Sequence, residues 1–218
     1  PRILYLSKNF GYPLGGVRIA HRHVALLRRN GFDARIVLVD DVENTFFDDA
    51  DMHIEKLSDY REFRVDDTLV VPEPWPNYIK KAGASKARSL VFCQNHFNLF
   101  FGLGDAPSFA EYGIDGVFCC SHVISRFLTD VIGESEAPVV RNAIDHGLFK
   151  PAPKRRQIAY MPRKMKHEAM FLKGLFRLRH PRYKSVPWVA IEQETEARVA
   201  EILGQSEIFV ALGRNEGF

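Results

Sequence analysis

Long apolar runs are absent from the 218-residue sequence. A helix that crosses a bilayer needs about 20 consecutive apolar residues, and no stretch of the chain approaches that length. The chain opens on the strand-like run RILYL, whereas a secretion signal would place a basic segment before an apolar one. We therefore expect a cytoplasmic protein with no membrane-spanning segment.

Cysteine is also scarce. The three cysteines, Cys93, Cys119 and Cys120, lie in apolar, strand-like stretches and show no C-x-x-C spacing. This pattern excludes a disulfide framework and the usual paired-cysteine metal or redox motifs. We expect buried, reduced thiols that have no metal-binding or redox role.

Two further absences exclude particular classes of protein. The sequence has no G-x-G-x-x-G fingerprint of dinucleotide-binding proteins. It also has no internal repeat and no low-complexity tract, which argues against a solenoid or a disordered chain. An apolar content of 46% and a charged content of 26% are instead typical of a globular protein with a true core.

The charges are segregated along the chain, although the formal net charge is only +3. The segment 40–67 carries eleven Asp or Glu residues and three Lys or Arg residues, whereas 141–184 carries thirteen Lys or Arg residues and only two acids. The second segment predicts an electropositive surface, which attracts nucleotide phosphates, nucleic acids or anionic lipids.

Short apolar runs alternate with helix-like segments over the first two thirds of the chain. Such alternation predicts a doubly wound α/β domain with a parallel sheet, which we assign to residues 1–150. The apolar positions Val17, Ala20, Val24 and Leu27 recur at helical spacing before Asn30-Gly31, a typical helix end. The expected strands are RILYL, ARIVLVD, TLVVP, LVFCQN, GVFCCS and APVVRNAI.

A proline-containing basic segment, HGLFKPAPKRRQ, then interrupts the pattern as a linker would. The alternation restarts with IAYMP, the helix-like KHEAMFLKGLFRLR, VPWVAI, TEARVAEILG and EIFVALG. We therefore assign residues 151–218 to a second α/β domain, and we expect it to be incomplete.

Candidate ligand-binding residues in the first domain follow two of the expected strands. Gly15 and Gly16 stand between the first strand and a helix, where glycines let the backbone approach a phosphate or sugar. The alternative is a tight turn without a chemical role. His96 follows LVFCQN, and a histidine at a strand end can steer a proton from a substrate hydroxyl. His21 and His23 lie two residues apart on a helix, and we expect them to be structural or solvated.

The second domain also contains candidate ligand-binding residues after its expected strands. Arg163, Lys164 and Lys166 follow IAYMP and precede a helix, a position from which cations can neutralise a diphosphate. Glu216 follows EIFVALG and is suited to hydrogen-bond sugar hydroxyls. No metal ligand is assigned.

Several segments in order resemble the family 4 glycosyltransferases, which have the two-domain GT-B fold. GGVRIAHRHVALLRRNGFDARIV is similar to their first glycine loop, helix and second strand, and IAYMPRK to the start of their donor domain. The segment 142–151 is similar to their N-G-V-D followed by F-x-P, with Ala143 in place of glycine, and NEGF to the start of their E-G-F-G motif. The resemblance covers nearly the whole chain.

The resemblance implies a role for each candidate residue. Gly15 and Gly16 would lie near the donor phosphate and the acceptor, and His96 on the acceptor side. Arg163, which follows Pro162 where the family has glycine, would bind the diphosphate together with Lys164 or Lys166. Glu216 would contact the donor sugar.

The implied activity is a metal-independent, retaining glycosyltransferase. It would move a sugar from a nucleotide-diphosphate donor to a glycan, lipid-linked or other hydroxyl acceptor in cell-surface polysaccharide synthesis. The resemblance also implies that the chain is part of a longer protein and inactive in isolation. We expect no nucleic-acid partner, and we allow peripheral contact of the basic surface with the inner face of the membrane.

Two alternatives remain at the level of the sequence. Asp49-Ala50-Asp51 forms a D-x-D that is able to hold a divalent cation on a diphosphate, as in single-domain glycosyltransferases. A protein without catalytic activity would instead use the basic segment 141–184 to bind nucleic acid or an anionic membrane, with affinity that falls steeply with salt.

Overall fold

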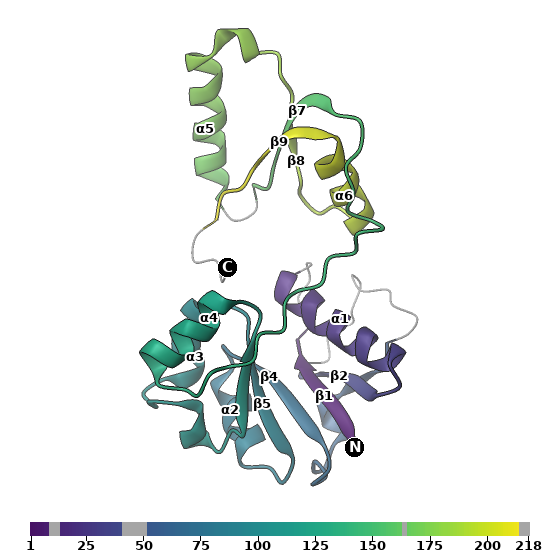
Figure 1. Cartoon of the computed structure of the whole chain (residues 1–218), viewed down its shortest axis with the longest axis vertical. Helices are drawn as coiled ribbons and strands as arrows, with labels where there is room; N and C mark the ends of the chain where they lie inside the picture. The colour runs from purple at the N-terminus through teal and green to yellow at the C-terminus, as the bar shows by residue number, and fades with distance from the viewer. Residues whose placement is uncertain (9–13, 41–51, 163–164, 214–218) are drawn as a thin grey trace. The chain divides into compact units, whose positions relative to one another are not determined.

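The structure, a computed structural model, describes residues 1–8, 14–40, 52–162 and 165–213. The chain divides into two compact units, which meet in sequence between Asn142 and Ala143 (Figure 1). Each unit contains its own parallel sheet, so the prediction of two doubly wound, Rossmann-like α/β domains is confirmed at the level of fold class. The GT-B relation between the two, and a domain boundary at residue 150, stay predictions.

The first unit is built on a six-stranded sheet in the order β3-β2-β1-β4-β5-β6. Every neighbouring pair in it is parallel, so the carboxyl ends of all six strands meet at one edge. The strands are β1 (Arg2–Ser7), β2 (Asp33–Leu38), β3 (Ile54–Lys56), β4 (Thr68–Pro72), β5 (Arg88–Cys93) and β6 (Gly116–Cys119).

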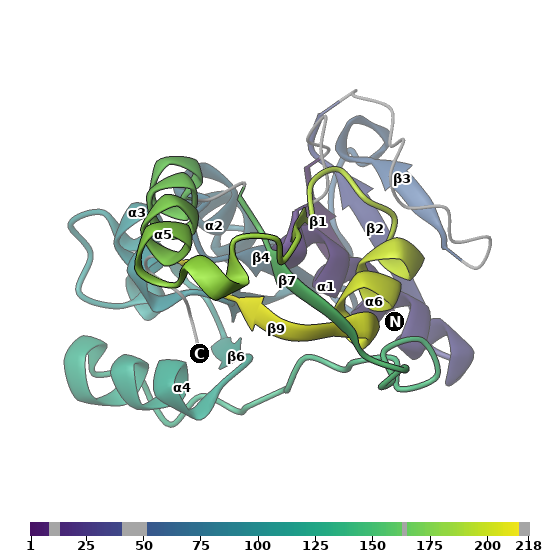
Figure 2. The ribbon, with the colours of Figure 1, turned by 90° about the horizontal axis from the view of Figure 1, so that it is seen from above.

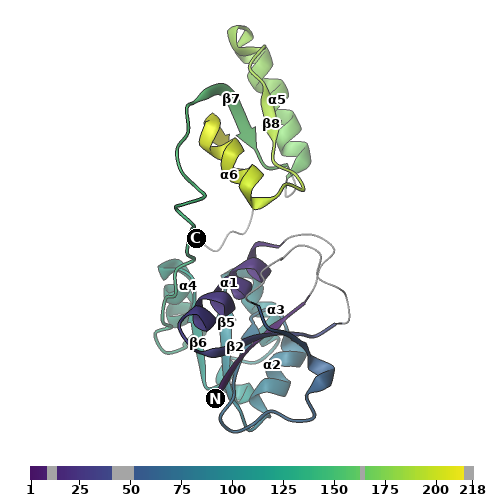
Figure 3. The same cartoon turned by 90° about the vertical axis from the view of Figure 1, so that its right-hand side faces the viewer.

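Helices cover both faces of this sheet. In two perpendicular views α1 lies on one face and α2 and α3 on the other (Figures 2 and 3), as right-handed crossovers require when the strand order runs outward in both directions from β1 and β4. The helices are α1 (Gly15–Arg29), α2 (Pro76–Gly83), α3 (Leu99–Leu103) and α4 (His122–Phe127), with short helical turns η1 (Leu57–Asp59), η2 (His96–Asn98), η3 (Phe109–Tyr112) and η4 (Leu128–Ile132).

The helical spacing recognised in α1 produces its buried face. Ala20 and Val24 are buried against the sheet, and the helix ends as expected, because Gly31 adopts a left-handed φ of 84°. The side-chain amide of Asn30 also donates to the carbonyl of Leu26 over 2.8 Å. One continuous hydrophobic core joins this helix to the strands and to α2, α3 and α4.

Two strand predictions need correction. The segment APVVRNAI forms no strand, and only Val139 bridges to Cys119 of β6. Pro138 lacks an N–H and cannot donate to a ladder, although its carbonyl accepts from the Cys119 amide over 2.9 Å. The sequence pattern also did not predict the short strand β3. Three residues within an acidic stretch show too little alternation of apolar and polar residues to indicate a strand.

The second unit has a three-stranded parallel sheet in the order β8-β7-β9. Its described core is small and centres on Ala159, Ile191 and Ile202. Several large apolar side chains of α5 and β9 are exposed, among them Phe171 at 72% and Leu178 at 76%. The elements are β7 (Arg155–Tyr160), α5 (Lys166–Arg179), η5 (Pro181–Tyr183), β8 (Trp188–Ala190), α6 (Glu196–Gln205) and β9 (Ser206–Val210).

Candidate active site at the carboxyl edge of the sheet

The strand order of the first unit has a switch point between β1 and β4. From β1 the chain builds outward through β2 to β3, and from β4 it builds the other way through β5 to β6. The connections on the two sides of a switch point leave toward opposite faces, which opens a crevice beyond the carboxyl ends of the strands. The residues that directly follow β1, β4 and β5 are therefore the first candidates for ligand contact.

The glycine loop and the end of β5 meet at this edge. The side-chain amide of Gln94, the first residue after β5, donates to the backbone carbonyl of Gly16 over 3.1 Å. A Cβ atom on Gly16 would lie 3.2 Å from the Gln94 amide nitrogen, whereas a Cβ on Gly15 would meet nothing within 4 Å. Both glycines are exposed at the start of α1, so the structure brings this predicted pair next to the end of β5.

Glu73, the first residue after β4, is buried at the same edge with only 3% of its surface exposed. Its carboxylate accepts a hydrogen bond from the Asn95 amide over 3.0 Å. Burial raises the pKa of Glu73 to about 7, even though hydrogen bonds from the backbone of Gln94 and Asn95 and from the Asn98 side chain oppose the rise. This carboxyl group thus ties the end of β4 to the loop after β5 and titrates near neutral pH.

His96 begins the turn η2 in the loop that Glu73 holds. Its ring is half-buried and lies against Phe97 and Phe127, with centroid separations of 4.2 and 5.0 Å. Within the described part of the chain, its Nδ1 atom is buried without a hydrogen-bond partner. The turn is closed by the Asn95 side chain, which accepts from the Phe97 amide over 3.0 Å.

The other two histidines singled out in the sequence are structural. His21 is buried within α1, and burial lowers its pKa to about 4. His23 lies against Phe92 with a centroid separation of 5.1 Å, and the Tyr5 hydroxyl lies 3.3 Å from its Nδ1 atom. Burial also lowers the pKa of His23. The ring of His23 therefore belongs to the contact between α1 and the sheet.

In the second unit, Lys166 is the first residue of α5 and is exposed. It stands where a helix begins after β7, and the amino terminus of such a helix favours an anion. Arg163, Lys164 and Glu216 lie outside the described residues, as do Asp49 and Asp51 of the D-x-D. Their roles stay predictions.

No family model matches the chain. The chain is similar to a protein of Actinobacillus pleuropneumoniae serotype 7 (strain AP76) named alpha-1,6-glucosyltransferase, with 26% identity over 211 residues. This similarity supports a glycosyltransferase. It covers 93% of the present chain and 63% of the relative, so the chain spans less than two thirds of the length of that protein.

The cysteines are all free and buried, as expected. Burial raises the pKa of each thiol, to about 11 for Cys120, and the nearby Glu73 carboxylate contributes to the shift at Cys93. Among the described residues no three His, Cys, Asp or Glu side chains are grouped so that they could hold a metal ion. In the same part of the chain, no helix has the length and apolarity to cross a bilayer.

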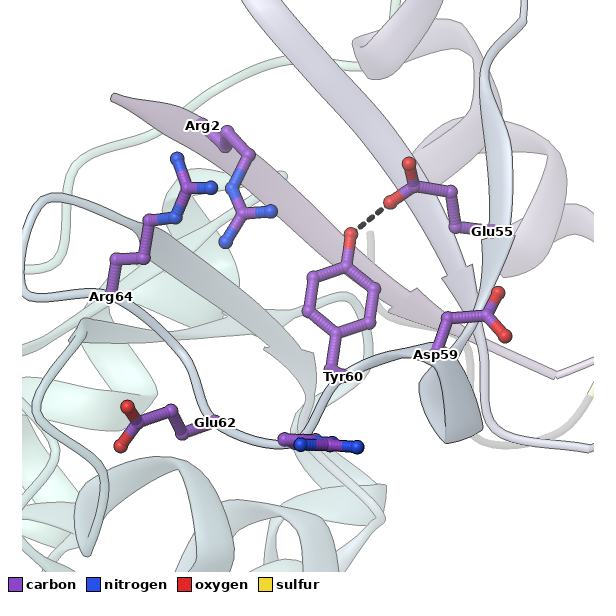
Figure 4. Close-up of a pocket in the computed structure, with 7 residues that line it drawn as sticks. Arg2, Glu55, Asp59, Tyr60, Glu62 and Arg64 are labelled. Atoms are coloured by element: carbon purple, nitrogen blue, oxygen red, sulfur yellow. Dashed lines mark hydrogen bonds between the residues drawn. The ribbon is translucent and has the colours of Figure 1, made fainter.

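One surface cavity, about 410 Å³, lies beside Arg2 at the start of β1 and not at the carboxyl edge (Figure 4). Several of the polar side chains that line it are hydrogen-bonded to other side chains. Arg2 donates to Asp67 over 2.6 and 2.8 Å, and the Tyr60 hydroxyl donates to Glu55. Burial would raise the pKa of Asp67, but its bonds from Arg2 and the Arg64 amide hold that pKa below its usual value. This network stabilises the edge of the sheet at the start of β1.

Sequence reasoning missed Glu73. The available signal was an acid directly after the apolar strand TLVVP and directly before a proline. A charged residue at that position is common in loops, and only the structure shows that it is buried against the loop after β5.

Proposed function

We propose that this protein is a nucleotide-sugar-dependent glycosyltransferase. The observation that carries the proposal is the similarity to a named glucosyltransferase over 211 residues, which run through both parallel-sheet units and not through one motif alone. The relative's name makes glucose the first donor sugar to test. A ligand crevice at the switch point of the first sheet is compatible with this function.

In the proposed reaction a hydroxyl of a glycan or lipid-linked acceptor displaces the nucleoside diphosphate from the sugar. Arg163 and either Lys164 or Lys166 stabilise the negative charge that develops on the diphosphate, and Glu216 binds the donor sugar. His96 lies on the acceptor side and steers the proton of the attacking hydroxyl. The proposal includes the GT-B arrangement, retention of anomeric configuration, independence of metal ions, and a role in cell-surface polysaccharide synthesis at the inner face of the membrane.

Glu73 acts in this scheme as a positioning residue. It fixes the backbone of Gln94 and Asn95 by hydrogen bonds, and this loop carries both the contact to Gly16 and the ring of His96. The acceptor side of the site is thereby held by the ends of two neighbouring strands.

The test is a thermal-shift screen of the full-length protein with UDP-, GDP-, dTDP- and ADP-glucose, followed by a transfer assay with the donor that binds. A ligand that binds only the folded state raises the apparent stability, by about 2.7 kcal/mol at a concentration 100 times its Kd. We expect one nucleotide series to raise the melting temperature, transfer to continue in excess EDTA, and the product to keep the anomeric configuration of the donor.

The opposing outcomes are equally specific. Transfer that EDTA abolishes would contradict metal independence and favour the D-x-D interpretation. Binding to no nucleotide sugar, together with binding to RNA or anionic vesicles that collapses between 50 and 200 mM salt, would favour the non-catalytic alternative.

A further inference from the structure

A second surface cavity of the first unit, about 270 Å³, lies on the switch point. Lys8 follows β1, Val39 and Asp40 follow β2, and Pro74 and Trp75 follow β4. The cavity thus spans the point where the strand order reverses, which is where open α/β sheets bind their ligands. Pro76, Asn77 and Tyr78 from the start of α2 complete the lining.

Two aromatic rings form a fixed apolar wall of this cavity. Trp75 is the residue that caps α2, and its carbonyl accepts from the amides of Tyr78 and Ile79 over 3.1 and 3.0 Å. The rings of Trp75 and Tyr78 are 5.6 Å apart at an angle of 57°. Both side chains are half-buried and pack against the hydrophobic core, so each ring is held in place while part of its surface remains accessible.

The remaining lining residues bring hydrogen-bonding groups of several kinds. Asp40 offers a carboxylate, Asn77 an exposed carboxamide and Lys8 an ammonium group. Together they can accept from and donate to hydroxyl groups. An aromatic wall together with such groups matches a pyranose ring, which has an apolar C–H face and a rim of hydroxyls. Burial of that face on the rings is favourable because it removes apolar surface from water.

The size of the cavity favours a single sugar ring over a larger ligand. Pockets for drug-sized molecules measure about 300 to 1,000 Å³, and at about 270 Å³ this cavity lies just below that range. It suits one sugar ring better than a complete nucleotide sugar.

We propose that this cavity is the acceptor subsite, in which a neutral hexopyranosyl unit stacks on Trp75 and Tyr78 and its hydroxyls bond to the exposed carboxamide of Asn77. The assignment as an acceptor subsite rests on the proposed function, whereas the binding of a sugar ring does not. The cavity adjoins Glu73 in sequence through Pro74, so it is continuous with the edge that carries the loop of His96.

The chain offers a direct optical test, because its two tryptophans lie in different units. Trp75 lines the cavity, and Trp188 belongs to β8 and contacts Tyr160 and Phe176. In the Trp188→Phe variant, tryptophan fluorescence therefore reports on the cavity alone. In the matched Trp75→Phe variant it reports on the second unit alone.

Each variant is titrated with maltotriose and isomaltotriose, with glycerol at equal hydroxyl concentration as the control. We expect a saturable change in emission in Trp188→Phe for at least one trisaccharide and only the linear response seen with glycerol in Trp75→Phe. No saturable change in Trp188→Phe with either trisaccharide would overturn the proposal. So would saturation by the nucleoside diphosphate instead of the sugars.

Kinetics separate this proposal from the proposed function. If transfer occurs, Trp75→Ala should raise the acceptor KM at least tenfold while the donor KM stays within twofold, and Tyr78→Ala should act in the same direction. Transfer with an unchanged acceptor KM in both variants would overturn the acceptor subsite and leave the glycosyltransferase standing. Saturable sugar binding at Trp75 in a full-length protein that transfers from no nucleotide sugar would contradict the proposed function and support the sugar site.

Discussion

At the scale of single residues, the candidate site depends on how a few polar side chains are buried. Glu73 and Asp67 are nearly equally buried, at 3% and 1% exposure, yet their pKa values move in opposite directions. Asp67 has the Arg2 guanidinium as a partner, which outweighs the effect of burial. Glu73 has mainly neutral amide donors, so burial prevails and its pKa rises to about 7. Of these two carboxyl groups, only that of Glu73 is therefore able to change charge near neutral pH.

Glu73→Gln should change how stability depends on pH. The carboxyl group has a pKa of about 7 in the folded state against an ordinary value of 4.5, so the folded state binds the proton more tightly. Its contribution to stability is fully present below pH 4.5 and is lost as the pH rises through 7. The full loss is about 3 kcal/mol, from about 1.4 kcal/mol per pKa unit.

The measurement is urea unfolding of both proteins between pH 5 and pH 8.5. The free energy of unfolding of Glu73→Gln minus that of the wild type should rise with pH by about 2 to 3 kcal/mol. Taking the difference removes other groups such as His21, whose lowered pKa acts in the opposite sense and costs stability only as the pH falls from 6.5 toward 4. A difference that is constant across this range would show that Glu73 does not titrate as described.

Arg163→Ala should weaken binding of the nucleoside diphosphate far more than Arg177→Ala. Arg163 follows the strand β7, where the proposed donor diphosphate binds, whereas Arg177 is an exposed residue near the end of α5. A charged hydrogen bond contributes about 1.5 to 3 kcal/mol, which corresponds to a loss of affinity of roughly 10- to 150-fold. Calorimetric titration of the two variants with the diphosphate measures this, and equal losses would refute the assignment of Arg163.

At the scale of elements, the helix α3 packs very closely against the end of β4, where Glu73 lies. A Cβ atom on Gly102 would lie 1.9 Å from the backbone oxygen of Glu73 and 2.9 Å from Ile79 Cδ1. Glycine is therefore required on this face of α3. The contact places α3 directly against the residue that joins β4 to the cavity.

Gly102→Ala should destabilise the protein by about 1 to 3 kcal/mol, because the new methyl group overpacks a backbone contact that cannot yield easily. Gly174→Ala is the matched control, since a Cβ there meets nothing within 4 Å and the residue lies inside the helix α5. That change should be neutral or stabilise by up to about 1 kcal/mol, because alanine is the better helix former. Urea midpoints compare the two, and similar midpoints would contradict the close contact.

At the scale of the whole molecule, the two units differ greatly in the extent of their cores. The first unit has one large cluster of buried apolar side chains. The described core of the second centres on three residues, and apolar side chains of α5 and β9 are exposed, among them Ile208 at 51%. Local stability follows buried apolar contact, so the two sheets should open with different free energies.

Hydrogen exchange followed by mass spectrometry tests this difference. Amides of β1, β4 and β5 should exchange only at the rate of global opening, whereas amides of β7, β8 and β9 should exchange at least tenfold faster, a difference of about 1.4 kcal/mol. A nucleoside diphosphate that binds the second unit should slow exchange in β7 and at the start of α5. Equal protection in the two sheets would show that they open as one cooperative unit.

The sequence determined the fold class, because its signals are local. Runs such as TLVVP and LVFCQN and the helical spacing in α1 predict strands and a helix without reference to distant residues. The same local rules placed Gly15 and Gly16 between the first strand and a helix, and His96 directly after a strand pattern. These rules wrongly predicted a strand over APVVRNAI, where Pro138 cannot donate a hydrogen bond to a neighbouring strand. They also missed the three-residue strand β3.

Only the tertiary structure decided what those strand ends do together. The contact of Gln94 with Gly16 joins residues 78 positions apart, and the bond from Asn95 to Glu73 joins residues 22 apart. The raised pKa of Glu73 comes from burial among distant segments, and the cavity with Trp75 exists because the strand order reverses between β1 and β4. The physical reason is that burial, electrostatics and shape depend on neighbours in space, and a linear pattern specifies those neighbours only after the sheet has formed.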